Sequence, residues 1–265
     1  MIPYIVHNIW IQGYNNLPKN EYNNLQMLKK LNPNYKFMFW DNVRIKQLLQ
    51  ELPEILKVYN ELEERKENTF PWRSDIARYV ILWKYGGIYS DLDIECIGTF
   101  DKIFTDNDKS DIYIASSEVT FLTKMSLNLF KTPKYGSYFM GFSKNHPVWK
   151  KIFKRIVNAK SKRDIGFAID NELQESKYKV VVIKQIQGHY NCSKNKDTIC
   201  VIPVESSWNM FRPILKKINC MNYKYIIIFL IIFLIIVILL LTINYPSFTK
   251  YIKKKKLIKY FIKYK

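Results

Sequence analysis

The chain has 265 residues, of which 48% are hydrophobic and 15% aromatic, and a formal net charge of +19. This composition supports a packed core and excludes a disordered or fibrous chain, and the length allows one large domain with an attachment. Eight of the positive charges are lysines within residues 250–265, and the part before Tyr225 keeps a net charge of +11, since 19 − 8 = 11. We therefore expect no nucleic-acid partner, although the basic balance suits a protein that handles phosphates or lies near anionic lipid.

Strand-like and helix-like patterns alternate along the chain, which indicates an α/β domain. We expect strands at residues 4–10, 35–41, 88–95, 111–117, 137–142 and 178–183. We expect helices at residues 22–33, 43–52, 53–66, 72–85, 146–159 and 167–176.

Residues 73–95, which read RSDIARYVILWKYGGIYSDLDIE, combine a helix, two glycines and a strand. The helix is predicted to bury one apolar face, with Asp75 and Arg78 as neighbours on its flank because they are three residues apart. Gly86 is placed to cap the helix, and Gly87 leaves the backbone bare where a ligand or another segment can approach.

In the strand that follows, alternation puts Asp91, Asp93 and Glu95 on one face. Three carboxylates in a row repel one another unless a positive group lies beside them. One interpretation is a solvated edge strand with ion pairs to Arg73 and Arg78. The other is a Mg²⁺ or Mn²⁺ site, since these ions take one or two carboxylates together with substrate phosphates. The joint occurrence of R-S-D-x-x-R, Y-G-G and D-x-D in one register favours the metal site.

Four segments in order, IPYIVHNIW, NPNYKFMFWD, RSDIARYVILWKYGGIYSDLDIE and MGFSKNHPVW, resemble the DXD-containing sugar transferases of glycosyltransferase family 32. A more distant likeness is to the large clostridial glucosylating toxins. The resemblance covers about residues 2–150. It implies a GT-A-like, Rossmann-type mixed sheet flanked by helices, a nucleotide-sugar donor, Mn²⁺ or Mg²⁺, and retention of the anomeric configuration.

The resemblance also implies roles for the residues that match the motif. Asp93 is expected to ligate the metal, and Asp91 to contact ribose and sugar hydroxyls and the metal through water. Asp75 and Arg78 are expected to hold the donor sugar and its diphosphate. Arg73 is expected to support them from the start of the same helix.

Two aromatic residues near the N-terminus have structural alternatives. Trp10 matches the residue that stacks on the nucleotide base, but an aromatic residue at the end of a strand is as often part of the core. His7 resembles a catalytic base, and we interpret it as a residue that holds the first strand by hydrogen bonding.

The second half of the chain departs from the family pattern. It lacks a Thr-Gly-Pro segment, and VESSWNMF keeps Ser207 and Trp208 without the expected histidine. We expect Ser207 and Trp208 to contact the donor and Glu205 to complete the metal site in place of that histidine. His189 is another candidate replacement, or a histidine of a surface loop.

Residues 225–243 are 19 uncharged residues, about 28 Å long as a helix, and are predicted to form one C-terminal transmembrane helix. The expected organisation is a transferase domain at 1–220, the span at 225–243 and a basic tail at 244–265. The lysines after the span favour a cytosolic tail and a lumenal domain in a Golgi or ER membrane. The lack of an N-terminal signal favours a cytosolic domain instead, so sidedness stays open.

The four cysteines form no CxxC pair and suggest no zinc site. We expect ordinary reduced cysteines, and the alternative is a bridge between Cys192 and Cys200 in an oxidising lumen.

The sequence therefore predicts a membrane-anchored, metal-dependent glycosyltransferase. Its favoured donor is GDP-mannose, followed by UDP-glucose or UDP-galactose, and its acceptor is a glycan or glycolipid. The second hypothesis is a catalytically degenerate transferase fold that acts as a membrane-bound scaffold or nucleotide-sugar sensor. The third is a basic protein that binds anionic membrane lipid or nucleic acid through residues 250–265.

Overall fold

The computed structural model describes residues 1–104, 110–116, 134–183, 185–187, 197–201 and 232–233. The chain divides into two compact units, Met1–Asn219 and Cys220–Lys265, and the description that follows concerns the first. Among the described residues, no helix is long and apolar enough to cross a membrane. The span predicted at 225–243 lies outside them apart from two residues, so it and the domain boundaries stay predictions.

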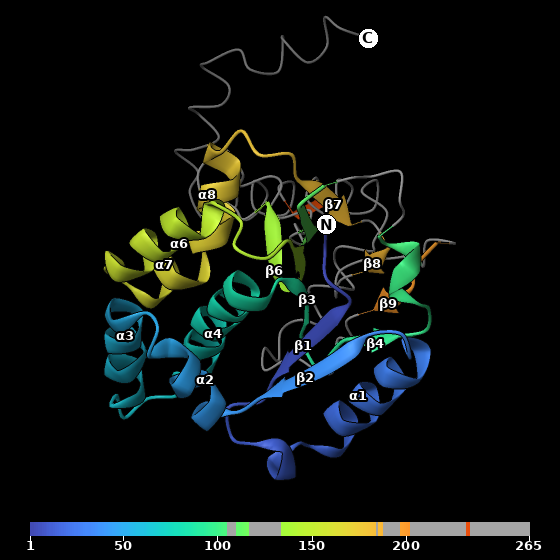
Figure 1. Cartoon of the computed structure of the whole chain (residues 1–265), viewed down its shortest axis with the longest axis horizontal. Coiled ribbons are helices and arrows are strands. Elements are labelled where there is room, and N and C mark those ends of the chain that lie inside the picture. The colour runs from blue at the N-terminus through green and yellow to red at the C-terminus, as the bar shows by residue number, and fades with distance from the viewer. Residues whose placement is uncertain (105–109, 117–133, 184, 188–196, 202–231, 234–265) are drawn as a thin grey trace, which may run out of the picture. The chain divides into compact units, whose positions relative to one another are not determined.

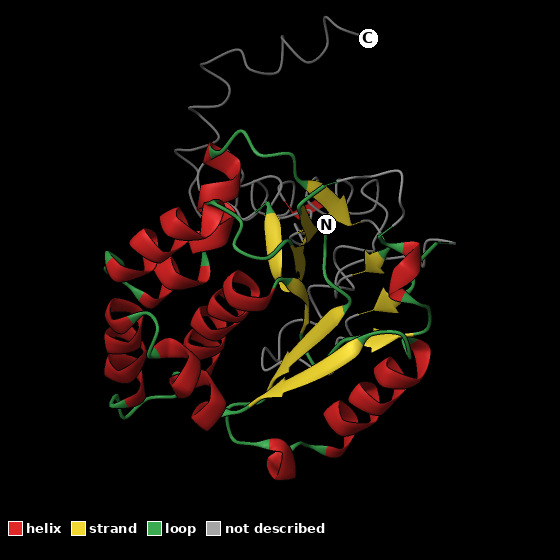
Figure 2. Cartoon of the chain, in the orientation of Figure 1, coloured by secondary structure: helices red, strands yellow, loops and turns green. Residues whose placement is uncertain are grey.

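A six-stranded mixed sheet forms the centre of the first unit, in the order β2-β1-β3-β6-β5-β7 (Figure 2). Its strands are β1 (Ile5–Ile9), β2 (Lys36–Trp40), β3 (Gly87–Ser90), β5 (Ile112–Ser116), β6 (Tyr135–Phe142) and β7 (Val181–Ile183). β1 is parallel to β2 and β3, whereas β6 is antiparallel to β3 and β5. The α/β class and the mixed sheet predicted from the sequence are thus confirmed.

Helices cover both faces of this sheet, as Figure 1 shows for α4 and α1 on opposite sides of β1. The helices are α1 (Lys19–Leu31), α2 (Asn42–Leu49), α3 (Pro53–Glu63), α4 (Phe70–Tyr85), α6 (Val148–Val157), α7 (Lys162–Gly166) and α8 (Ala168–Glu175), with 3₁₀ turns η1 (Tyr14–Asn16) and η2 (Phe100–Lys102). One core cluster packs α2, α3, α4, α6 and α8 on the first face. The second cluster joins α1, η2 and a small second sheet to the other face.

The helix that carries Asp75 and Arg78 is buried nearly all round, and the prediction of a single apolar face for it is wrong. Seven of its consecutive residues, from Ile76 to Leu82, are all buried. The helix lies between the sheet and the outer helices α3, α6 and α7, so most of its surface meets protein. Polar groups on it must therefore find partners inside the fold.

Two glycines follow α4, and because they carry no side chain the backbone can pass close to neighbouring segments as it enters the sheet. Gly86 and Gly87 have φ values of 62° and 90°, and a Cβ at Gly87 would lie 2.5 Å from the carbonyl oxygen of Ile5. β3 can therefore lie directly against β1. The close approach predicted for Gly87 is confirmed, and the approaching segment is the first strand.

The strand predicted at 88–95 is too long, because β3 ends at Ser90. A turn follows, and the carbonyl oxygen of Leu92 accepts a hydrogen bond from the Nδ2 of Asn24 on α1 at 3.0 Å. Leu92 and Ile94 are still buried while Asp91 and Asp93 are partly exposed, so the alternation continues through the turn. Glu95 is exposed and begins the next strand, β4 (Glu95–Cys96).

A second, three-stranded sheet was not predicted, and it overturns the expectation for the cysteines. Its order is β4-β9-β8, with β4 at Glu95–Cys96, β8 at Ile186–Gln187 and β9 at Cys200–Val201. Cys96 and Cys200 face each other across β4 and β9 and form a disulfide, although 104 positions separate them in the sequence. They are not reduced, and Cys200 does not bond to Cys192, which lies outside the described residues.

Candidate active site

A cavity of about 590 Å³ lies beyond the C-terminal end of β1, where four segments far apart in the sequence meet. It is lined by the end of β1 and the loop after it, the first turn of α1, the first turns of α4, and the end of β3 with its turn. Its polar and aromatic lining residues include Trp10, Glu21, Ser74, Arg78, Asp91 and Asp93. Ligands bind at such a position, beyond the carboxyl ends of parallel strands, in many open α/β sheets.

Another cavity, of about 710 Å³, lies between α6 and the junction of α2 and α3. Its lining includes Leu52, Ile55, Phe153 and Lys154, and it contains none of the residues predicted to act on a substrate. The smaller cavity is therefore the candidate site, because it brings together the carboxylates and the arginine of the D-x-D segment.

Arg78 is the central cation of this site and is held by five neighbouring residues. Its Nη1 donates to the carbonyl oxygen of Ser137 at 2.9 Å and to the Oγ of the same residue at 3.1 Å, and its Nε donates to Ser74 O at 3.3 Å. Its Nη2 lies 3.5 Å from an oxygen of Asp75 and 3.5 Å from an oxygen of Asp91. The guanidinium also lies over the Tyr89 ring, 4.7 Å from the ring centre.

Asp91 and Asp75 share this cation but lie in different surroundings. Asp91 accepts a hydrogen bond from the Tyr89 hydroxyl, and its side chain is 29% exposed in the cavity wall. Asp75 is 15% exposed and does not line the cavity. The pKa of Asp75 is raised to about 6, because burial raises it more than the charge of Arg78 lowers it, and the charge of Asp91 adds to the rise. Arg78 thus forms ion pairs with Asp91, which lines the cavity, and with Asp75, which does not.

Burial by itself would lower the pKa of Arg78, but its neighbours, Asp91 first, outweigh burial and hold this pKa above the ordinary value. The guanidinium therefore stays charged at any physiological pH. Burial, with the charge of Asp91, also raises the pKa of the Tyr89 hydroxyl well above its usual range, so this hydroxyl stays a hydrogen-bond donor.

Trp10 forms part of the cavity wall, and its ring is held by the loop that follows it. The indole Nε1 donates to Asn16 O at 3.1 Å, and Asn16 Nδ2 donates to Gln12 O at 2.6 Å. Trp10 is partly exposed and lines the cavity, and its predicted role in stacking on a base stays a prediction.

His7 is confirmed as a residue that holds the first strand. It is fully buried, its Nε2 bonds to Gly86 O at 2.9 Å, and its Nδ1 accepts from the indole of Trp40 at 3.2 Å. Burial lowers its pKa to about 4, which keeps the ring neutral. These two bonds require the tautomer with the proton on Nε2, and the ring does not line the cavity.

Arg73 points away from the cavity, into the layer formed by α2 and α3. Its Nη2 donates to Glu63 Oε1 and to Asn42 Oδ1, both at 2.7 Å, and the guanidinium lies 4.8 Å from the centre of the Tyr59 ring. The structure thus brings Trp10, Arg78, Asp91 and Asp93 together at one cavity and leaves Arg73 outside it. Glu205, Ser207, Trp208 and His189 lie outside the described residues, and their predicted roles stay predictions.

Comparison with known proteins agrees with this arrangement. Residues 18–110 match the family described as the glycosyltransferase sugar-binding region containing the DXD motif. Over this region the chain is similar to the DXD-containing glycosyltransferases.

The curated relatives of this chain include an uncharacterized glycosyltransferase of Acanthamoeba polyphaga mimivirus, 35% identical over 59% of this chain and 56% of the relative. Inositol phosphoceramide mannosyltransferase 3 of Schizosaccharomyces pombe is 28% identical over 58% of this chain and 37% of the relative. The chain thus spans about half, or less, of these two proteins. The PaToxG glycosyltransferase structure is 17% identical, covers 66% of this chain and 69% of its own, and has a TM-score of 0.48.

The two aspartates of the DXD motif fit a divalent cation that is shared with a substrate. Among the described residues, no three His, Cys, Asp or Glu side chains gather as a metal-binding group. Asp91 and Asp93 nevertheless line the same cavity, and Mg²⁺ or Mn²⁺ is commonly held by one or two carboxylates with substrate phosphates. The residues present therefore suit a cation that binds together with a diphosphate.

Sequence reasoning missed three residues of this DXD site. Ser137 holds Arg78, Asn24 holds the turn between the aspartates, and Glu21 lines the cavity. No local pattern marks Ser137 or Asn24, because their partners lie 59 and 68 positions away. Glu21 carried a faint signal, as an acidic residue in the first turn of its helix, but that position is also common in helices with no site.

Proposed function

We propose that this chain is a metal-dependent, retaining glycosyltransferase that moves a hexose from a nucleotide sugar to a glycan or glycolipid. The observation that carries the proposal is the cavity shared by Asp91, Asp93 and Arg78, inside the segment that matches the DXD family. Mannose is the favoured sugar, from GDP-mannose, because curated relatives are named as mannosyltransferases; a UDP-hexose is the alternative. A GT-A fold is part of the same proposal.

The chemistry requires that negative charge be stabilised on the diphosphate as the glycosidic bond breaks. A divalent cation held by Asp93 and Asp91 supplies part of that stabilisation when it is bound. Arg78 supplies a fixed positive charge at the cavity wall, and its ion pair with Asp91 orients that carboxylate. Because Arg78 is already held by Ser137 and Ser74, it needs no reorganisation when the substrate charge develops.

The remaining residues bind and orient the donor. Asp91 is placed to accept hydrogen bonds from ribose or sugar hydroxyls with the oxygen lone pairs that Tyr89 leaves available. The Trp10 ring provides a surface for stacking a nucleobase. Asp75 acts through Arg78 in this description, and direct contact of Asp75 with the donor sugar stays a prediction.

The test uses the full chain in detergent, GDP-mannose and UDP-hexoses, and measures nucleotide release with and without Mn²⁺. We expect release from one donor that rises with Mn²⁺ and falls at least about 100-fold in Asp93→Ala. The matched control is Glu95→Ala, which removes an exposed carboxylate two positions away that lies outside the cavity lining. Equal rates in the two variants would contradict the proposal.

The same experiment decides the degenerate-fold alternative. A chain that binds nucleotide sugar in a manner dependent on Mn²⁺ and Asp93, but releases no nucleotide with any donor or acceptor tried, is a sensor or scaffold. Binding of anionic vesicles that is lost on removal of residues 250–265, with no nucleotide binding at all, supports the basic membrane-surface hypothesis.

We also propose that the chain is a single-pass membrane protein, anchored by residues 225–243, with its domain in the lumen of a Golgi or ER-type membrane. The Cys96–Cys200 disulfide supports this sidedness, because such bonds persist mainly in oxidising compartments. The test is thiol alkylation of cell extracts without reductant. Protection of Cys96 and Cys200 from alkylation is expected, whereas full labelling of both contradicts a lumenal domain.

A further inference from the structure

The end of the cavity that lies toward α1 carries an acidic group with no assigned role. Glu21, in the first turn of α1, lines the cavity together with Trp10 and Gln12. It does not gather with Asp91 and Asp93 as a metal-binding group in the part of the chain that the structure describes. The cavity therefore has a second acidic position, on a different element from the D-x-D turn.

The carboxylate of Glu21 is partly buried, and no hydrogen bond or ion pair links it to any other described residue. Most other acids of the domain with similar burial are paired. Glu63, for example, accepts from both Arg73 and Asn42. A partly buried carboxylate without partners in a cavity wall is available to accept hydrogen bonds from a ligand.

Trp10, which lines the same cavity as Glu21, is held in a fixed position by hydrogen bonds. The Trp10 backbone is held at both sides, since its N–H donates to Trp40 O and its carbonyl accepts from Gly13 N–H, each at 2.9 Å. The bond from the indole Nε1 to Asn16 fixes the plane of the ring. A planar group that stacks on Trp10 therefore lies in a defined plane, with its edges toward the surrounding cavity wall.

The chemistry of the bases then separates the candidates. A carboxylate only accepts hydrogen bonds. The Watson–Crick edge of guanine offers two adjacent donors, N1–H and N2–H, which match the two carboxylate oxygens. Uracil offers one N–H between two carbonyl acceptors, and these oxygens repel a carboxylate. An unpaired carboxylate beside a stacking surface thus favours guanine over uracil.

We propose that Glu21 selects the nucleobase of the donor, by accepting hydrogen bonds from guanine while Trp10 stacks on the ring. This inference rests on the proposed function, because it assumes that the cavity holds a nucleotide. It assigns Glu21 as the residue that sets specificity for a guanine nucleotide against a uridine nucleotide.

The structural alternative is that Glu21 only stabilises its helix. Acidic residues in a first turn interact favourably with the helix dipole, and Glu21 occupies such a position. The chain offers a matched control in Glu54, which lies in the first turn of α3, is exposed, and borders the other cavity. Glu21→Gln and Glu54→Gln each remove one negative charge from the first turn of a helix, and only the first touches the candidate site.

The experiment measures the equilibrium binding of GDP and of UDP to the full chain in Mn²⁺, by calorimetry, for the wild type and both variants. We expect the wild type to bind GDP more tightly, and Glu21→Gln to lower the ratio of GDP to UDP affinity about 10-fold or more, mainly by weakening GDP. Glu54→Gln should leave the ratio unchanged. Thermal unfolding of both variants checks that α1 and α3 still form.

Other outcomes overturn the inference. An unchanged ratio in Glu21→Gln, or an equal change in the affinity for both nucleotides, shows that Glu21 does not read the base. Binding is measured without turnover, so the two proposals can fail separately. If the chain transfers no sugar but its ratio of GDP to UDP affinity depends on Glu21, the proposed function is wrong and this inference holds. If the chain transfers sugar but Glu21→Gln leaves the affinity ratio unchanged, this inference is wrong and the proposed function holds. If neither GDP nor UDP binds, both proposals are wrong.

Discussion

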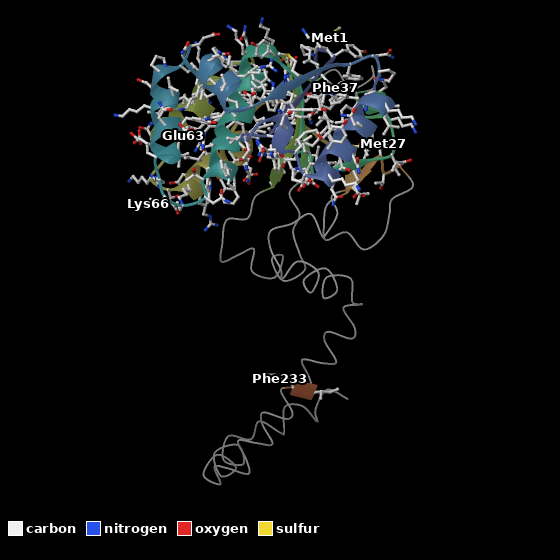
Figure 3. The ribbon with its side chains drawn as sticks, turned by 90° about the horizontal axis from the view of Figure 1, so that it is seen from below. Met1, Met27, Phe37, Glu63, Lys66 and Phe233 are labelled. Carbon is white, nitrogen blue, oxygen red and sulfur yellow. A yellow bond between two sulfur atoms is a disulfide. The ribbon has the colours of Figure 1, made fainter. Side chains whose placement is uncertain are left out.

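Arg73 and Arg78 lie five positions apart on α4, and both are buried, at 5% and 7% exposure, yet they belong to different parts of the molecule. Arg73 faces α2 and α3, where Glu63 and Asn42 accept its hydrogen bonds. Arg78 faces the end of the sheet, where it lies between Asp75 and Asp91. Figure 3 shows Glu63, the partner of Arg73, on the side of the domain away from Met27 of α1.

A buried, paired arginine is therefore not by itself a sign of function. Both guanidinium groups satisfy the same demand, which is that a buried charge must be paired and hydrogen-bonded. What separates them is where their partners lie. Glu63 belongs to a helix–helix contact, whereas Asp91 lines a cavity that is large enough for a ligand.

The largest effect on activity is expected from Arg78→Ala. We expect the rate of sugar-nucleotide turnover to fall about 100- to 1,000-fold, since the variant loses the fixed positive charge at the cavity and leaves Asp91 without its cation. Arg78→Lys should not restore activity, because one ammonium group cannot reach Ser137, Asp75 and Asp91 together. Steady-state kinetics on protein with a native circular dichroism spectrum gives the measurement, and activity near that of the wild type in either variant would refute the assignment.

A smaller effect, of a different kind, is expected from Arg73→Ala. Removing the arginine leaves Glu63 and Asn42 with fewer partners and should lower the free energy of unfolding by about 3 kcal/mol, with turnover by the folded protein within about twofold of the wild type. Urea unfolding and kinetics well below the melting temperature measure the two quantities. Arg65→Ala, at an exposed ion pair, is the control and should change stability by less than about 0.5 kcal/mol. A loss of activity at unchanged stability would instead place Arg73 in the site.

The smallest effect is on the pH dependence of stability, and it has opposite signs for Asp75, a partner of Arg78, and Glu63, the partner of Arg73. The folded-state pKa of Asp75 is raised to about 6 by burial, so this group favours the folded state at low pH and that contribution is lost as the pH rises from about 4 to 6. Burial opposes ionisation of Glu63, but hydrogen bonds from Lys46 and Asn42 and the charge of Arg73 lower its pKa below 4.5. Its contribution is present above pH 4.5 and is lost as the pH falls through the folded pKa.

Two variants separate these contributions. Asp75→Asn should remove the part of the pH dependence of stability between about pH 4 and 6, and Glu63→Gln the part below 4.5, in urea titrations at a series of pH values. If both variants change the same pH range, the two arginine networks are not distinct in the way described.

Local pattern was enough for much of the fold. The central strands and most helices follow from alternation and from helical periodicity, and Gly86 and Gly87 mark the tight turn between α4 and β3. The alternation of Asp91 and Asp93 with buried Leu92 and Ile94 also placed both carboxylates on one side, even though the strand ends before them.

Local pattern therefore indicated the class of the fold, the D-x-D segment and the resemblance of that segment to a glycosyltransferase family. Which way Arg73 points, which residues hold Arg78, and which cysteines bond were decided only by the tertiary structure. The physical reason is distance along the chain. Periods of 2 and 3.6 residues report on neighbours within one element, whereas Arg78 meets Ser137 across 59 positions and Cys96 meets Cys200 across 104. Such partners are chosen by how whole elements pack, and no local pattern records that choice.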